Sequence, residues 1–375
     1  MGKVSAKFFK NHVISTEYYM EDEIRRYGAK VLSLVWCSRD FARMMGNENP
    51  YGPSSKVIEA IKRSIHEIYR YPEPTYIRLL EKLSEYVGVG KENILIGAGS
   101  MELIDSTLRA FIDPNDEVVL SAPTYKPYLL RIRICGGKPV LIPMRRLPHE
   151  FRYDVEGMLE AVTPRTKAVV IINPNNPTGA LMDGKRIEEF LDKEVLVMVD
   201  EAYFEFSGKT VAHLAPENEN LIVLRSMSKA FGIAGLRVGY AIMHPKVADY
   251  IRRVQLPFRL SELSAAAALA ALEDLDYMRE TVKKIVDERE RLFDELKKIN
   301  GLHPYKSNAN FILVGVKRKD VTAGQLSSKL LSRGVIVRDF TGAPGLEDGS
   351  YFRVSVSTPE NNAKLVNALK GILGE

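Results

Sequence analysis

The stretch Leu221-Ile-Val-Leu-Arg-Ser-Met-Ser-Lys229 indicates the fold, because a short apolar run leads directly into a polar turn. Four further runs of this kind stand in the middle of the sequence, each followed by a polar or glycine-rich turn. Near-continuous β-branched and aliphatic runs are typical of strands that are buried on both faces of a parallel sheet. The five predicted strands are 94–97, 118–120, 168–172, 195–199 and 221–224.

Helical stretches separate these runs, so the middle of the chain is predicted to be α/β with a mainly parallel sheet flanked by helices. One such helix is expected to start at Pro53 and stop at Pro72, with Val57, Ile61, Ile65 and Ile68 on one apolar face. Ligands bind at the carboxyl ends of the strands in sheets of this type. The five polar turns are therefore expected to converge on one site.

The C-terminal part of the sequence predicts a smaller α+β domain. Residues 261–298 lack proline and glycine and are read as one long helix that leads into this domain. The predicted domains are 53–259 for the large one, and 1–52 with 260–375 for the small one. Beyond the long helix, the pattern predicts strands at 309–314 and 351–356 and helices at 321–332 and 359–372.

Composition excludes several classes of protein. Apolar residues make up 45% and charged residues 27% of the 375 residues, which is ordinary globular composition. No apolar run approaches the roughly 20 residues that span a bilayer. Residues 1–10 are polar and carry no signal-peptide core, so a cytoplasmic location is expected.

Cysteine and basic residues point to no special site. Cys37 and Cys135 show neither disulfide-framework nor metal-ligand spacing, so no metal is expected and both are predicted to be buried free thiols. The net charge of +5 is modest for this length. A basic stretch at 131–146 is more often a solvated face than a nucleic-acid patch, and no nucleic-acid partner is expected.

In their order, and each behind a strand, the polar turns resemble those of fold-type I pyridoxal-5'-phosphate (PLP) enzymes, aminotransferase class I and II. The resemblance runs from about Asn47 to the C-terminus. It implies that Lys229 holds the cofactor as a Schiff base and that Ser226 and Arg237 bind its phosphate. A lysine becomes nucleophilic when desolvation and a nearby cation lower its pKa, and Arg237 is such a cation. The ordinary alternative is a surface lysine at the start of a helix.

Three further residues resemble the family's contacts to the cofactor ring. Asp200 matches the carboxylate that pairs with the pyridine nitrogen and keeps the ring an electron sink. Tyr203 and Asn176 match the partners of its phenolate oxygen. Taken alone, Asp200 could equally be a helix N-cap, and Asn176 could belong to a plain turn.

The first glycine-rich turn resembles the family's phosphate cradle. Gly99, Ser100 and Met101 lead from a strand into a helix, whose N-terminal N–H groups can bind a phosphate. Tyr125 matches the aromatic side chain that stacks on the cofactor ring, although a core tyrosine is an open alternative.

Within the family, several motifs resemble histidinol-phosphate aminotransferases, among them Gly46-Asn-Glu-Asn-Pro-Tyr-Gly-Pro53 and Arg70-Tyr-Pro-Glu73. The resemblance implies a homodimer in which Tyr71 reaches the partner subunit's PLP phosphate. It also implies a small-molecule amino donor and a 2-oxo acid acceptor, such as histidinol phosphate and 2-oxoglutarate. The substrate contacts implied are Arg353, Arg338, Asn49 and Tyr51.

Two guanidiniums suit a phosphate or dicarboxylate, because each binds the anion through a fixed fork of donors. Arg338 could instead be a solvated charge at a strand end. The chain departs from the subfamily in residues 18–43, where the usual tyrosine followed by a Pro-Gly pair is missing.

This departure leaves other functions open. They are a broad or aromatic aminotransferase, a PLP-dependent decarboxylase of a phosphorylated amino acid, and, more remotely, a non-catalytic PLP-sensing regulator.

Overall fold

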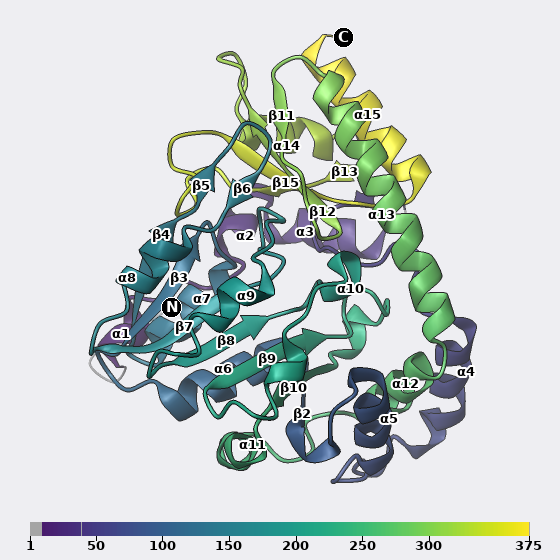
Figure 1. Ribbon diagram of the computed structural model, residues 1–375. Helices are drawn as coiled ribbons and strands as arrows, with labels where there is room; N and C mark the ends of the chain where they lie inside the picture. Colours follow the sequence, from purple (N-terminus) through teal and green to yellow (C-terminus); the bar gives the residue numbers. More distant parts are fainter. Residues whose placement is uncertain (1–9, 39, 375) are drawn as a thin grey trace, which may run out of the picture.

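The computed structural model describes residues 10–38 and 40–374, so most of the N-terminal stretch 1–10 lies outside the described residues. A seven-stranded sheet forms the centre, in the order β2-β10-β9-β8-β7-β3-β4 (Figure 1). All its strands are parallel except β10, which is antiparallel to both neighbours. The strands are β2 (Ile94–Gly97), β3 (Glu117–Ala122), β4 (Lys138–Pro143), β7 (Thr166–Ile172), β8 (Leu196–Asp200), β9 (Leu221–Ser226) and β10 (Gly239–Met243).

The α/β class and all five predicted strands are confirmed. Strands β4 and β10 were not predicted from the sequence. Strand β4 carries the apolar run Val140-Leu-Ile142, but Pro139 and Pro143 flank it, and prolines argue against a strand. Strand β10 begins at Gly239, in the segment that was read as part of the Lys229 motif.

Helices cover both faces of the sheet, and two apolar clusters pack between the sheet and these helices. The helices of this part are α4 (Ser55–Ser64), α5 (Ile77–Val87), α6 (Ser100–Phe111), α7 (Lys126–Ile134), α8 (Val155–Glu160), α9 (Gly184–Glu188), α10 (Phe204–Ser207), α11 (Pro245–Arg252) and α12 (Glu262–Leu272). Short 3-10 turns are η2 (Ile65–Glu67), η3 (Lys91–Asn93), η4 (Ala212–Leu214) and η5 (Ala234–Leu236), and a small hairpin is β5 (Arg145–Arg146) with β6 (Phe151–Arg152).

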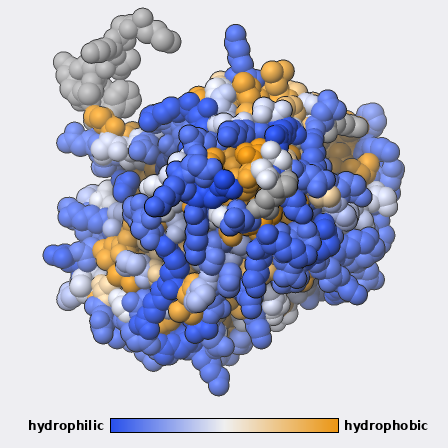
Figure 2. All heavy atoms as spheres, turned by 90° about the horizontal axis from the view of Figure 1, so that it is seen from above, coloured by the Kyte–Doolittle hydropathy of each residue, from blue (hydrophilic) through white to orange (hydrophobic). Residues whose placement is uncertain are grey.

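A second layer is built on the four-stranded sheet β11-β12-β15-β14 and has its own apolar core. Seen from above (Figure 2), hydrophilic side chains cover most of this end of the molecule, with apolar side chains in separate patches. Its elements are α13 (Leu275–Lys298), β11 (Leu302–Pro304), β12 (Phe311–Val316), α14 (Ala323–Leu331), β13 (Val335–Ile336), β14 (Arg338–Asp339), β15 (Tyr351–Ser355) and α15 (Pro359–Leu373).

The N-terminal segment forms three helices, α1 (Asn11–Ile14), α2 (Glu21–Tyr27) and α3 (Ala29–Cys37), followed by β1 (Ala42–Arg43), which pairs with β13. In Figure 1, α2 and α3 (purple) lie between the two sheets. We call residues 11–37, which hold α1 to α3 and the turns between them, the N-terminal cover.

Two helix predictions were wrong in extent. The helix after Pro53 ends at Ser64 and tightens into η2, and Ile65 and Ile68 are 47% and 63% exposed, so the predicted apolar face is buried only in its first half. The long helix at 261–298 is two helices, because the backbone leaves the helical region at Asp274 (φ −134°, ψ 48°). The first of them, α12, packs on α4 and α5.

The two thiols are not buried as predicted. Cys37 is the last residue of α3 and is exposed, since α3 packs through Leu32 and Val35. Cys135 follows α7 and is partly buried. None of the described helices combines the length and the apolar character that crossing a membrane requires.

Candidate active site

A cavity of about 320 Å³ opens where the strands β7, β8 and β9 end. It brings together residues from all five predicted polar turns and from the small sheet, so the predicted convergence is found. Eleven of the predicted site residues line it: Ser100, Met101, Tyr125, Asn176, Asp200, Tyr203, Ser226, Lys229, Arg237, Arg338 and Arg353.

Lys229 lies three residues beyond β9, and its Nζ donates a hydrogen bond to the Gly46 carbonyl at 2.9 Å. Burial lowers the pKa of Lys229 to about 8, and the cations Arg353 and Arg237 contribute to the lowering. A substantial fraction of this amine is therefore neutral and nucleophilic near pH 8. It is not the solvated surface lysine of the ordinary alternative.

Asp200 ends β8 and is 3% exposed. Its Oδ1 accepts the Ala202 N–H at 3.0 Å and its Oδ2 accepts the Tyr128 hydroxyl at 3.0 Å. Burial raises the pKa of Asp200 to about 6. A buried carboxylate of this kind favours a cation as its partner, and a protonated pyridine nitrogen supplies one.

A hydrogen-bonded chain fixes the hydroxyl of Tyr203. Arg353 donates to Asn176 Oδ1 at 2.6 Å, and because a guanidinium cannot accept, the Asn176 amide group must point to Tyr203, 3.3 Å away. Asn47 Nδ2 donates to the same hydroxyl at 3.0 Å. With two donors directed at its oxygen, Tyr203 keeps its own O–H free to donate to a ligand oxygen. The motif containing Asn47 was recognised in the sequence, but this residue was not predicted as part of the site.

The N-terminus of α6 and Arg237 form a pocket for an anion. Gly99 precedes α6 with φ +77°, and a Cβ on it would lie 2.4 Å from Arg237 Nη2. Only glycine leaves Arg237 room beside the free N–H groups of the first helical turn. Ser228, which was not predicted, accepts from Arg237 Nη1 at 3.2 Å and also lines the cavity.

Aromatic rings form one wall of the cavity. Tyr125 lies edge-on to both Tyr128 and Tyr19, with ring centroids 6.4 Å apart in each pair. Tyr19, Met20 and Trp36 come from the N-terminal cover and line the cavity directly. No sequence motif marked these three residues, since the turn before α2, which holds Tyr19 and Met20, and helix α3, which holds Trp36, reach the cavity only through tertiary packing.

Arg338 lies in the wall of the cavity with its side chain only 14% exposed, so it is not a solvated charge. Its Nε is 2.7 Å from Oε1 of Glu23 in α2, and its guanidinium lies 5.3 Å from the centre of the Tyr19 ring. Arg353 is 6% exposed, and burial lowers the pKa of this guanidinium to about 10. Arg353 is thus charged at neutral pH, and both guanidiniums line the cavity.

Four predicted residues do not line this cavity in the single chain: Gly99, which precedes α6, and Tyr71, Asn49 and Tyr51. Tyr71 is 79% exposed and stacks on Phe258 with ring centroids 4.4 Å apart. Asn49 Nδ2 donates to the Ala230 carbonyl at 2.9 Å and so supports the loop after Lys229. Tyr51 packs beside Lys284 of α13. Within residues 10–38 and 40–374, no group of three His, Cys, Asp or Glu side chains is placed to hold a metal ion.

The chemistry of this cavity fits PLP at each part of the cofactor. Lys229 offers a nucleophilic amine, Asp200 a partner for the pyridine nitrogen, and Tyr203 a donor for the phenolate oxygen. The N–H groups at the start of α6, with Arg237, offer an anion pocket for its phosphate. Fold and site together define a fold-type I PLP enzyme.

Comparison with known proteins agrees. The family model for aminotransferase class I and II matches residues 40–369, and the chain belongs to this family. A histidinol-phosphate aminotransferase of Methanothermobacter thermautotrophicus is 39% identical over 332 residues, covering 88% of each chain. One of Archaeoglobus fulgidus is 41% identical, covering 88% of this chain and 99% of its own.

Solved structures show the same fold. The histidinol-phosphate aminotransferase of Sinorhizobium meliloti, in complex with pyridoxal-5'-phosphate, superposes with a TM-score of 0.85 at 28% identity, covering 98% of this chain and 97% of its own. The L-threonine-O-3-phosphate decarboxylase of Porphyromonas gingivalis superposes with a TM-score of 0.78 at 21% identity, covering 89% of this chain and 100% of its own, which shows a shared fold alone.

Proposed function

We propose that this PLP-dependent aminotransferase transfers the amino group between histidinol phosphate and 2-oxoglutarate. The observation that carries the proposal is the pair of buried guanidiniums, Arg353 and Arg338, in the cavity that holds Lys229. The names of the relatives at 37–41% identity support the same substrate.

The two arginines are proposed to select the substrate. Arg353 donates through Nη1 to Asn176 and through Nη2 to the Met45 carbonyl, both at 2.6 Å, while its buried Nε has no hydrogen-bond partner. One arginine suffices for a single carboxylate. A second one matches a substrate with a doubly charged anion or two carboxylates, and histidinol phosphate and 2-oxoglutarate each meet that description.

When bound, the cofactor supplies an electron-withdrawing ring that weakens the bond between the substrate's Cα and its hydrogen. Asp200 maintains the positive charge on the ring nitrogen. Lys229, released when the incoming amine takes its place, would accept the Cα proton on its neutral Nζ and deliver it to C4' of the cofactor. Asn176 holds Tyr203 and Arg353 in one hydrogen-bonded chain, so ring orientation and anion binding are mechanically linked.

Steady-state kinetics with histidinol phosphate and with phenylalanine or tyrosine as donors, each paired with 2-oxoglutarate, test this proposal. We expect kcat/KM to be much higher for histidinol phosphate. Higher turnover of the aromatic amino acids would replace the assignment by a general aromatic aminotransferase. Release of CO2 without amino transfer from a phosphorylated amino acid would instead identify a decarboxylase.

We also propose a homodimer with shared sites. The exposed apolar side chains that support it lie on η2, on the segment 68–71 and on the segment 256–258. Exposed apolar patches of this kind are typical of protein interfaces. Sedimentation tests the proposal: a fully active species of the single-chain mass, 42.2 kDa, would contradict it. The exposed apolar residues of η2 and of the segments 68–71 and 256–258 are Ile65, Ile68, Tyr69, Tyr71, Leu256 and Phe258.

The cytoplasmic location predicted from the sequence belongs to this proposal as well. Cell fractionation followed by detection of the chain tests it.

A further inference from the structure

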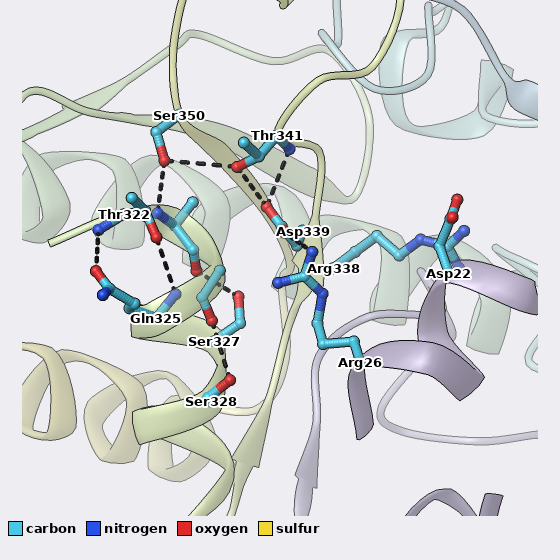
Figure 3. Close-up of polar contacts among 12 residues, drawn as sticks. Asp22, Arg26, Thr322, Gln325, Ser327, Ser328, Arg338, Asp339, Thr341 and Ser350 are labelled. Carbon is cyan, nitrogen blue, oxygen red and sulfur yellow. Dashed lines mark hydrogen bonds and ion pairs between the residues drawn. The ribbon is translucent and has the colours of Figure 1, made fainter. Parts of the chain in front are cut away.

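Two ion pairs hold helix α2 of the N-terminal cover to strand β14. In one pair the helix supplies the carboxylate, and in the other it supplies the guanidinium. Glu23 of α2 pairs with Arg338, and Arg26 of α2 pairs with Asp339, the next residue of β14. Figure 3 shows Arg26 pointing from α2 toward Asp339, while Arg338 reaches back toward the beginning of α2. Nearby, the Tyr27 hydroxyl donates to the Val337 carbonyl at 3.3 Å.

The two ion pairs differ in what surrounds them. Arg338 lines the cavity that contains Lys229, whereas Arg26 and Asp339 do not. Burial does not distinguish the two carboxylates: the side chains of Glu23 and Asp339 are 6% and 3% exposed, and each has a carboxylate oxygen without a hydrogen-bond partner. The difference is one of position, because only the Glu23 pair involves a guanidinium of the cavity that contains Lys229.

The pairing creates a conflict with an anionic substrate. Arg338 is one of the two cations proposed to bind the substrate's anion, yet Glu23 already occupies its Nε at 2.7 Å. A phosphate that approached Arg338 would meet the buried Glu23 carboxylate at close range, and like charges at low dielectric repel strongly. Substrate phosphate and Glu23 therefore compete for one guanidinium.

Space for a displaced Glu23 exists beside the site. A second cavity of about 630 Å³ lies between α2, α7 and the segment 337–344, and Glu23 lines it. It shares Thr124, Lys126, Arg338 and Phe340 with the wall of the first cavity. Lys126 is itself held by carboxylates of Asp22 at 2.6 Å and Glu17 at 3.0 Å. The contacts of the cover in this region are thus largely ionic and can exchange partners.

We propose that Glu23 is a specificity-determining residue, an internal carboxylate that occupies Arg338 until a substrate's phosphate or second carboxylate displaces it. This inference rests on the proposed function, in which the donor carries a phosphate. A strongly anionic group displaces Glu23 from Arg338, whereas a more weakly anionic group does not. Glu23 also pairs with the charge of Arg338 when no such anion is bound.

The test measures binding of inorganic phosphate to the holoenzyme, in which the cofactor already fills its own phosphate pocket. Trp36 is the only tryptophan of the chain and lines the cavity, so its fluorescence reports binding without turnover. In Glu23→Gln the competing charge is gone, and we expect phosphate to bind about tenfold more tightly or better, as expected when a charged hydrogen bond no longer has to be broken. Adding Arg338→Ala to this variant should abolish the gain.

Arg26→Gln is the matched control, because it breaks the neighbouring ion pair of the same helix and leaves the charge on Glu23 intact. If both variants tightened phosphate binding equally, loosening of the cover would explain the result and the proposal would be overturned. Weaker or unchanged binding in Glu23→Gln would also overturn it, since Glu23 would then merely orient Arg338. Should Glu23→Gln fold poorly, Glu23→Asp keeps the charge but shortens its reach, and an intermediate tightening is expected.

Kinetics separate this proposal from the proposed function. Glu23→Gln should lower KM for histidinol phosphate by a similar factor and leave KM for phenylalanine nearly unchanged. If histidinol phosphate is not a substrate, the proposed function fails, while the phosphate-binding measurement still decides the role of Glu23.

Discussion

Replacing Gly99 by alanine probes the anion pocket at the N-terminus of α6. Gly99 has φ +77°, and an added Cβ would lie 2.4 Å from Arg237 Nη2 and 3.1 Å from its Cζ. Two costs follow. An L-residue at φ +77° and ψ 164° lies in a region that essentially only glycine occupies and is strained by roughly 1–3 kcal/mol, and the Arg237 guanidinium must shift from its position beside α6.

The second cost concerns cofactor binding alone. A hydrogen bond from a charged group contributes about 1.5–3 kcal/mol, so displacing Arg237 should weaken PLP binding by roughly 10- to 150-fold. The assay is a titration of the apoprotein with PLP, followed by the absorbance of the bound cofactor. The melting temperature of the apoprotein, measured in parallel, reports the backbone strain separately.

Gly88 provides a control for a positive φ without a steric contact, because it follows α5 with φ +80° and ψ 29° and nothing lies within 4 Å of an added Cβ. Gly88→Ala should lower the melting temperature of the apoprotein and leave PLP affinity unchanged. Wild-type PLP affinity in Gly99→Ala would refute the assignment of this pocket to the cofactor phosphate.

Three other outcomes are expected. Because burial lowers the pKa of Lys229 to about 8, capture of PLP by the apoprotein should accelerate as pH rises through 8, and borohydride should fix no pyridoxyl group in Lys229→Ala. Arg338→Ala should weaken histidinol phosphate by about 1.5–3 kcal/mol and leave phenylalanine nearly unaffected, as donor kinetics would show. Burial raises the pKa of Glu205 from 4.5 to about 8, so the folded state binds the extra proton and stability falls as pH rises across that window. Glu205→Gln should remove this loss and stabilise the protein at pH 8 by about 1–3 kcal/mol, measured by denaturant unfolding at pH 5 and pH 8.

The half of the site that fits the cofactor could be predicted because its residues follow strand ends directly. Asp200 and Lys229 come after buried β-branched runs, and a parallel sheet brings such positions to one edge. The central strands of the sheet were easier to predict than the strand at its β4 edge. Strand β4 was missed because Pro139 and Pro143 flank its apolar run, and prolines argue against a strand.

Residues whose role depends on contacts distant in sequence were not predictable. Asn47 reaches Tyr203 across 156 positions and Tyr128 reaches Asp200 across 72, and neither pattern is visible along the chain. The kink between α12 and α13 was missed for a related reason. Helix propensity alone favours continuity there, while Lys56 of α4 binds Asp274 and helps hold the break.

The division between predictable and unpredictable residues follows the chemistry of the enzyme. In the proposed site, the residues assigned to the cofactor follow strand ends of the large sheet. On the proposed substrate side, Arg338 and Arg353 of the small sheet were predicted from family motifs, whereas Tyr19 and Glu23 of the N-terminal cover were not. A change in the cover can therefore alter which anion is accepted without touching Lys229 or Asp200. It follows that substrate preference in this chain should respond to substitutions in α2 more readily than cofactor affinity does.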